Sequence, residues 1–226
     1  MNRIKLILII TFLIIKSTYS IQPIYNIVYE SKFHQNILPE NLNTAFYLFD
    51  SIDSLLIPKS NSVFENNFGN TLFRLSKIFF TNYLVTDYML TMNHEFGHGY
   101  RMIEAGGTIK KIVYNWPPPF SNDFSYITLD RPANFTKQQE LMINLGGSEI
   151  NLVFSDVMRK NILLQGRFNY SYSFAYLYSS NDMPGYTAFV RRSAGDPERY
   201  RQNLNEFYYS NGKFLTRDKI KNYSFL

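Results

Sequence analysis

The sequence predicts a mostly helical α+β fold in a single domain, residues 21–226, that follows a short targeting segment. Apolar residues recur at three- and four-residue steps through most of the chain, which is typical of amphipathic helices. Two short stretches near the middle are instead rich in β-branched and aromatic residues, as strands are. The 226 residues are 45% hydrophobic and 18% charged, and no repeat or shift in composition marks a second domain.

Residues 1–20 have the pattern of a signal peptide. Arg3 and Lys5 precede the apolar run Leu6–Ile15, and small and polar residues follow as far as Ser20. As a helix this run is about 15 Å long, half of the roughly 30 Å core of a bilayer. We therefore predict cleavage after Ser20 and export to the periplasm or the cell exterior, with an uncleaved N-terminal anchor as the alternative.

The charge of the mature chain gives no reason to expect a nucleic-acid partner. Loss of Arg3, Lys5 and Lys16 lowers the 23 basic residues to 20, against 18 acidic ones, so the net charge falls from +5 to +2. The absence of cysteine excludes disulfides, Cys-ligated zinc and a Cys nucleophile. The chain has only 3 histidines, so their arrangement is informative.

Three helices are expected before the first strand. Apolar stripes predict helices over 39–56 and 70–80, and the pair Thr81-Asn82 is expected to form a turn or the cap of the next helix. That helix should run from about 83 to 105, because Gly106-Gly107 is a strong C-terminal signal.

A hairpin or two short strands should follow. Residues 108–116 and 124–129 are β-branched and aromatic, and a proline-rich loop separates them. The apolar loop tip Trp116–Phe120 could grip substrate, touch lipid or pack on the core, and packing is the default interpretation. Peripheral contact with a membrane is open, but nothing else in the sequence indicates it.

The second half of the chain is predicted to be mostly helical. A helix with a capping-box start is expected over 136–164 and should end at Gly166. A second, aromatic-rich helix over 170–178 should break at Asp182–Gly185. Asp196-Pro197-Glu198 is typical of a helix start, and we expect that helix to reach about residue 210.

The helix over 83–105 contains the motif His94-Glu95-Phe96-Gly97-His98. On a helix the two histidines lie on one face about 6 Å apart, so both can bind one Zn²⁺ at about 2.0–2.1 Å. Glu95 lies beside them, where it can take a proton from a water that the metal activates. A chance match is the alternative, but the helical setting with apolar flanks favours a metal site.

A catalytic zinc needs a third protein ligand and an open fourth position. Glu149 is the preferred candidate because it interrupts the apolar stripe of its helix, where a lone carboxylate needs a partner. The preceding Gly146-Gly147 pair would let this helix approach Gly97 of the motif closely. His34 is the other candidate, and a kinked helix with Glu149 on a solvated face is the alternative interpretation.

Other polar residues are weaker candidates for the same site. Asp87 lies two turns before the motif and Asp156 two turns after the predicted third ligand, so each could hydrogen-bond a ligating side chain. An ordinary surface carboxylate is the alternative for both. Tyr186 and Arg191 follow a loop and could enter the cleft to stabilise an oxyanion or bind substrate.

The HEFGH motif on a helix, followed by a glutamate on a later helix, resembles the gluzincin metallopeptidases. The order beyond it is similar to the site-2-protease-like group: a helix end at Gly106-Gly107, two strands, then a Gly-rich helix with Asn151. The resemblance covers roughly residues 83–156. It lacks that group's spanning helices and the aspartate after its Asn-x-x-Pro segment, which Asn181–Pro184 matches in part. We therefore do not expect intramembrane proteolysis.

The resemblance implies a zincin-like fold that binds one zinc ion. It gives His94 and His98 the role of ligands, Glu95 that of general base, and Glu149 that of third ligand. It also implies a peptide or protein substrate. In zincins an edge strand beside the motif helix binds extended substrate by main-chain pairing, and the strand over 108–114 would take that role.

The leading hypothesis is therefore a secreted or periplasmic zinc peptidase. A non-catalytic metal-binding or interaction protein on the same fold is the alternative, and a metal-dependent hydrolase of a substrate other than a peptide is a third. Glu95 favours an enzyme, because a structural metal site has no use for a base. The cleavage preference and the oligomeric state are left open.

Overall fold

A computed structural model describes the greater part of the chain. The predicted signal peptide and its cleavage site, His34 and Arg191 lie outside the described residues. Within the described part, no helix combines the length and the apolar character needed to span a membrane. The described residues are 37–56, 68–117, 120–121, 123–165, 170–189, 195–208 and 215–224.

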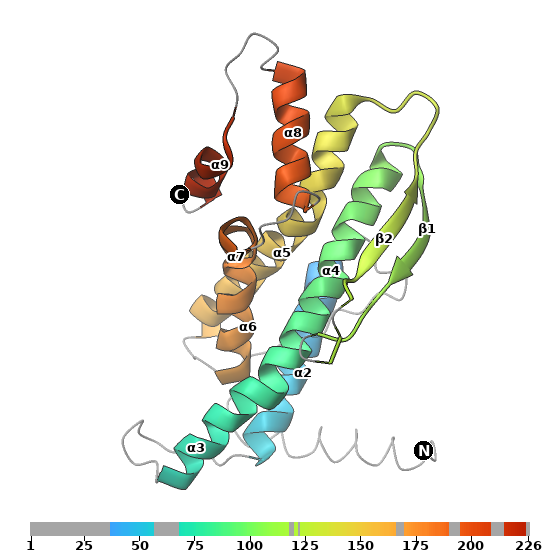
Figure 1. Cartoon of the computed structure of the whole chain (residues 1–226). Coiled ribbons are helices and arrows are strands. Elements are labelled where there is room, and N and C mark those ends of the chain that lie inside the picture. The colour runs from blue at the N-terminus through green and yellow to red at the C-terminus, as the bar shows by residue number, and fades with distance from the viewer. Residues whose placement is uncertain are drawn as a thin grey trace, which may run out of the picture.

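The described residues form a mostly helical α+β structure, as predicted (Figure 1). A two-stranded antiparallel sheet consists of β1 (Thr108–Val113) and β2 (Tyr126–Asp130). The helical elements are α2 (Leu38–Leu56), α3 (Phe68–Lys77), the π-helical turn η2 (Ile78–Asn82), α4 (Tyr83–Glu104), α5 (Lys137–Gln165), α6 (Tyr170–Ser180), α7 (Asp182–Phe189), α8 (Asp196–Tyr208) and α9 (Arg217–Ser224).

The expected turn at Thr81-Asn82 is wrong, whereas Asn82 does occupy the N-cap position of α4. The chain instead continues from α3 through η2 into α4, with Asn82 in helical geometry at φ −64° and ψ −43°. The buried Asn82 side chain makes no cap hydrogen bond, and its Nδ2 donates to Ser171 Oγ of α6 at 3.0 Å. A tertiary hydrogen bond has thus replaced the local capping bond that asparagine ordinarily makes.

Helices α4 and α5 cross at two glycines, and this contact brings the motif helix against α5 (Figure 1). A Cβ atom on Gly146 would lie 2.6 Å from the carbonyl oxygen of Gly97. A Cβ on Gly97 would lie 2.7 Å from Ile150 Cγ2 and closer still to the backbone of Gly146. Neither position has room for a side chain, so the predicted close approach of the two helices is confirmed.

The β1–β2 hairpin lies along α4, next to the motif. Its register pairs Thr108 with Asp130 and Val113 with Tyr126, and a bulge interrupts the pairing between Ile109 and Lys111. A Cβ on Gly99 of α4 would meet the side chains of Ile109 and Ile127, so the strands rest directly on the helix. The prediction of a strand over 108–114 close to the motif helix is confirmed.

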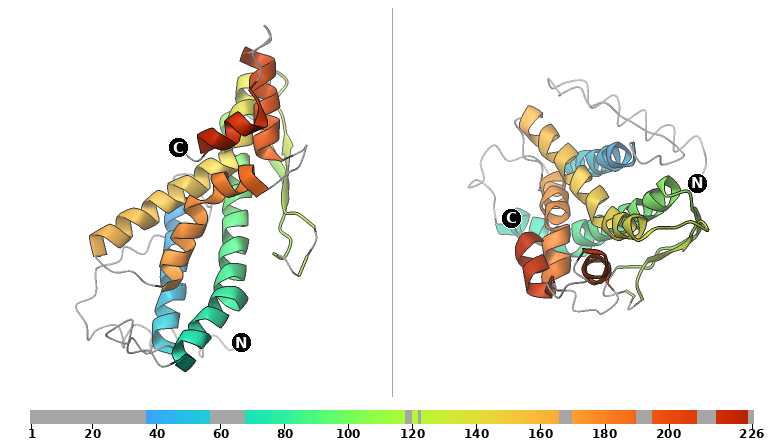
Figure 2. Two further views of the ribbon diagram at one scale, coloured as in Figure 1. Left: turned by 60° about the vertical axis from the view of Figure 1, so that its left-hand side comes forward. Right: turned by 90° about the horizontal axis from the view of Figure 1, so that it is seen from above.

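The buried core lies where α2, α4, α5 and α6 meet, and its α4 member, Leu90, is one turn before the motif (Figure 2). The rings of Phe46 and Phe154 are 5.5 Å apart at its centre. Its buried members are Leu42, Phe46, Leu90, Phe154, Met158, Ile162, Tyr172 and Ala175. The core therefore fixes α5 and α6 against α2 and the early part of α4.

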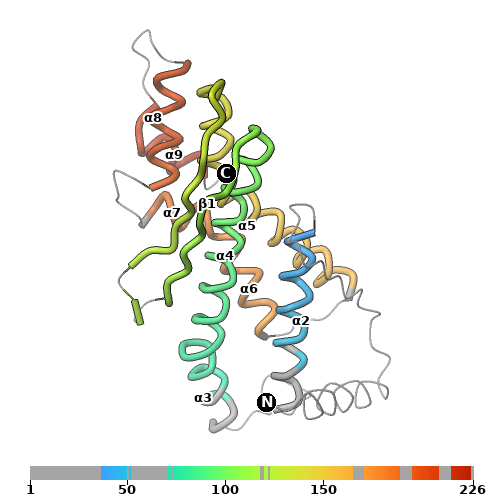
Figure 3. The backbone as a smooth tube through the Cα atoms, turned by 90° about the vertical axis from the view of Figure 1, so that its right-hand side faces the viewer, coloured from blue at the N-terminus to red at the C-terminus, as the bar shows by residue number. Residues whose placement is uncertain are grey.

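Helices α7, α8 and α9 gather at the other end, where α7 and α8 pack against α5 and α9 packs against α7 and α8 (Figure 3). The sequence predicted a break over 182–185, but α7 begins at Asp182 and runs through it. Pro184 is compatible with this helix because residues of the first turn need no intrahelical N–H partner. Helix α9 was not predicted, and Ile220 is the side chain that it buries.

Candidate metal centre

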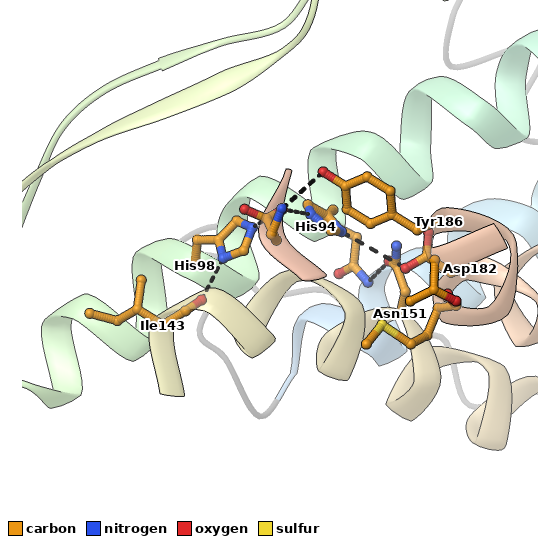
Figure 4. A network of polar contacts seen from close by, with 10 residues as sticks. His94, His98, Ile143, Asn151, Asp182 and Tyr186 are labelled. Atoms are coloured by element: carbon orange, nitrogen blue, oxygen red, sulfur yellow. Dashed lines mark hydrogen bonds and ion pairs between the residues drawn. The ribbon is translucent and has the colours of Figure 1, made fainter. Parts of the chain in front are cut away.

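Three side chains converge between α4 and the start of α8. Asp196 Oδ2 lies 3.0 Å from His94 Nε2 and 3.2 Å from His98 Nε2. One ligand atom from each of the three residues lies within 4.8 Å of the other two, so the group can hold a metal ion. Figure 4 shows the two imidazoles side by side, with ring centroids 4.7 Å apart.

The spacing of these atoms suits a tetrahedral metal. Metal–ligand bonds of about 2.0–2.1 Å place the ligand atoms of a tetrahedron about 3.3 Å apart. The two distances from the Asp196 oxygen, 3.0 and 3.2 Å, are close to that value. Two histidines and one carboxylate also leave a fourth position open, as catalytic zinc sites do.

The buried His98 ring has a fixed orientation. Its Nδ1 lies 2.6 Å from the carbonyl oxygen of Ile143 on α5, and because a carbonyl can only accept, Nδ1 must carry the proton. Nε2 then faces Asp196 and the metal position, where it would bind a metal through its lone pair when it carries no proton. A carbonyl partner of this kind is what orients metal-binding histidines in other proteins.

The His94 ring packs against α5 at the second glycine of the Gly146-Gly147 pair. A Cβ on Gly147 would lie 2.5 Å from His94 Cδ2, so only glycine leaves room for the ring. On the other side, His94 Nδ1 lies 3.9 Å from Asp182 Oδ2. Burial lowers the pKa of His94, but Asp182 and Asp196 outweigh it and raise the pKa to about 10.

Asp196 enters the site from the first residue of α8. Burial alone would raise its pKa, but the contacts with His94 and His98 outweigh burial and lower it. The Tyr186 hydroxyl lies 3.4 Å from Asp196 Oδ2 and accepts a hydrogen bond from the Asp196 amide at 3.3 Å. Burial, and then the charge of Asp196, raise the pKa of Tyr186, so this hydroxyl stays protonated.

Glu95 lies beside the histidines and is only 8% exposed. Burial raises the pKa of its carboxyl group, while His94 and His98 lower it in part. A backbone hydrogen bond from Ile127 of β2 also stabilises the ionised form. The carboxylate is thus buried near both imidazoles, on the side of the hairpin.

The structure does not bring Glu149, the predicted third ligand, into this group. Its carboxylate accepts hydrogen bonds from Arg101, at 2.9 Å from Nε and more closely from Nη2, and its side chain is 46% exposed. The periodicity of α5 explains this position of Glu149. Glu149 is two residues beyond Gly147, about 200° around α5, so it faces away from the His94 side.

The two carboxylates predicted to support the ligands also lie elsewhere. Asp87 accepts a hydrogen bond from the Tyr178 hydroxyl at 2.5 Å, and burial raises the pKa of this carboxyl group. Asp156 pairs with Arg159 and Lys160 on the exposed side of α5. Of the predicted site residues, the structure therefore brings together the three motif residues and Tyr186.

Asp196 is the residue that sequence reasoning missed. Its position before Pro197 is typical of a helix start. An aspartate is common there as a cap, so nothing in the local pattern indicated a metal ligand. A second signal was present, because Asp196 is the first acidic residue to follow the Asn181–Pro184 segment. The site-2-protease-like order would have pointed to an aspartate in this part of the chain.

Comparisons with protein-family models, with curated proteins and with solved structures gave no significant match. The geometry of the centre is therefore the basis for any assignment of function.

Proposed function

We propose that this protein is a zinc-dependent peptidase with His94, His98 and Asp196 as metal ligands and Glu95 as general base. The observation that carries the proposal is the convergence of two Nε2 atoms and one carboxylate oxygen next to a buried glutamate. The donor set of two imidazoles and one carboxylate is one that zinc favours, so the residues fit the ion. A purely structural metal site needs no base, so it would not explain a buried carboxylate beside the two histidines.

Zinc, when bound, would supply a Lewis acid that polarises a carbonyl and lowers the pKa of water. The buried carboxylate of Glu95 would accept a proton from the attacking water and deliver it to the nitrogen of the leaving amine. Burial raises the pKa of Glu95, which favours its acceptance of the proton. The Tyr186 hydroxyl donates to Asp196 Oδ2 in this structure, and it would be a donor for the oxyanion once it turned away from that carboxylate.

The hairpin supports an extended peptide as substrate. Within the described residues β1 and β2 pair only with each other, so each strand has a free outer edge. A peptide can add to such an edge by main-chain hydrogen bonds. The interaction between Glu95 and the backbone of Ile127 favours β2, rather than the predicted 108–114 strand, as the one nearer the catalytic carboxylate.

The test compares Glu95→Gln with Glu149→Gln in the full chain. We expect Glu95→Gln to keep one zinc per protein but to lower peptide hydrolysis by at least about 10²–10⁴-fold, because it removes the base alone. Glu149→Gln, the control, should keep both zinc and activity, since Glu149 pairs with Arg101.

Two results would contradict the proposal in different ways. If Glu95→Gln cleaves peptides as fast as wild type, Glu95 is not the base. If wild type binds zinc but hydrolyses neither a peptide library nor ester substrates, the non-catalytic alternative is correct.

A further inference from the structure

The two histidines of the centre differ in what holds the nitrogen that faces away from Asp196. In His98 this nitrogen is Nδ1, and it donates to the carbonyl oxygen of Ile143. The partner nearest to His94 Nδ1 in the described part of the chain is Asp182, and the His94 side chain is only 13% exposed. If Nε2 is to bind a metal, Nδ1 must carry the proton, and a buried N–H needs an acceptor.

Asp182 is the acceptor within reach. Its Oδ2 lies 3.9 Å from His94 Nδ1, which is an ion-pair distance rather than a hydrogen bond. This oxygen is itself buried and accepts no hydrogen bond from the described part of the chain. Figure 4 shows Asp182 on the far side of His94 from His98. A little-exposed imidazole nitrogen and a buried carboxylate oxygen that lacks a hydrogen bond among the described residues therefore face each other.

The position of Asp182 has a second explanation. It is the first residue of α7, where a negative charge is favourable to a helix N-terminus. That explanation does not account for Oδ2, which is buried and takes no backbone N–H. Leaving a carboxylate oxygen buried and unpaired is costly, and its place beside the imidazole offsets that cost only if the two interact.

We propose that Asp182 is the positioning residue for His94. Its carboxylate accepts the Nδ1 proton and thereby directs the Nε2 lone pair toward the metal, as the Ile143 carbonyl does for His98. The sequence had suggested Asp87 for such a role, but Asp87 is bonded to the Tyr178 hydroxyl. The inference rests on the proposed metal site and not on peptide hydrolysis.

The experiment measures zinc affinity by competition with a chromophoric chelator for wild type, Asp182→Ala and Asp182→Asn. Asp87→Asn is the matched control, because Asp87 is a neighbouring part-buried carboxylate whose partner is a tyrosine. We expect Asp182→Ala to weaken zinc binding by about 10–100-fold. Asp182→Asn keeps an acceptor without the charge and should weaken it by less, and Asp87→Asn should stay within about twofold of wild type.

Two further measurements separate positioning from loss of structure. The visible spectrum of the Co²⁺-loaded protein should change in Asp182→Ala and stay as in wild type for Asp87→Asn, because only the former releases a ligand ring. Thermal unfolding of the metal-free variants shows whether both fold. If Asp182→Ala does not fold, the zinc affinity of Asp182→Asn tests the positioning role instead.

The outcomes are distinct. Wild-type affinity in Asp182→Ala, or in Asp182→Asn where only that variant folds, overturns the positioning role. An equal loss in Asp87→Asn also overturns it, since the effect would then come from any nearby negative charge. If wild type binds no zinc, both this inference and the proposed function fail. Zinc binding without hydrolysis contradicts the proposed function alone.

Discussion

The two sides of the candidate metal centre differ in what positions their residues. On one side, His94, Glu95 and His98 belong to one short stretch of α4, and the helix itself sets their geometry. On the other side, Asp196 lies 102 residues after His94 and depends on the docking of α8. The first side is therefore a local structure, whereas the second exists only when the C-terminal helices are packed against α5.

The largest effect is expected when the proposed ligand of the second side, Asp196, is removed. Asp196→Ala removes a carboxylate that lies 3.0 and 3.2 Å from the two imidazoles. Zinc affinity should fall by more than the roughly 10–100-fold that is typical of groups behind the ligands. Activity should be lost with it, as metal analysis and peptide hydrolysis will show.

Asp156→Ala is the control for that loss. Asp156 is 40% exposed and pairs only with Arg159 and Lys160 among the described residues. Its removal should leave zinc content at the wild-type value. A zinc-replete Asp196→Ala protein would show that α4 alone holds the metal, and the comparison between the two sides would then fail.

A change in α5 tests how the first side is held in place. Gly147→Ala puts a methyl group 2.5 Å from His94 Cδ2, so the imidazole must move. We expect the free energy of unfolding to fall by about 1–3 kcal/mol, as overpacking ordinarily costs, together with weaker zinc binding. Denaturant unfolding with and without zinc measures both.

Gly185→Ala in α7 is the matched substitution. No heavy atom of the described residues lies within 4 Å of the Cβ that it would add. Alanine also favours helix over glycine by up to about 1 kcal/mol. This variant should be as stable as wild type or slightly more so. Equal destabilisation by both substitutions would contradict the role assigned to Gly147.

The smallest effect is expected from Glu149→Ala. The carboxylate is 46% exposed and forms an ion pair with Arg101 on the surface. Such pairs stabilise a protein by at most about 1 kcal/mol, and Glu149 does not contact the histidines. Calorimetry should therefore find a small change in stability, and zinc titration none. Loss of zinc from this variant would instead support Glu149 as the third ligand, as the sequence suggested.

The sequence was a good guide wherever one helix decides the geometry. The spacing of His94 and His98 fixes their common face, and the Gly146-Gly147 pair correctly indicated a close approach to Gly97. It misled for Glu149, although helical periodicity already turns that residue away from Gly147. The local pattern could not identify Asp196 as a candidate ligand, because capping and the helix dipole already account for an aspartate at a helix start.

The order of the ligands along the chain has a consequence for biosynthesis. Asp196 follows His98 by 98 residues. At about 5–20 residues per second, a ribosome takes between roughly 5 and 20 s to add that stretch. During this interval the nascent chain carries His94, Glu95 and His98 without the carboxylate that would complete the candidate centre. The centre can therefore form only after synthesis has passed Asp196 and α8 has folded against the rest of the chain.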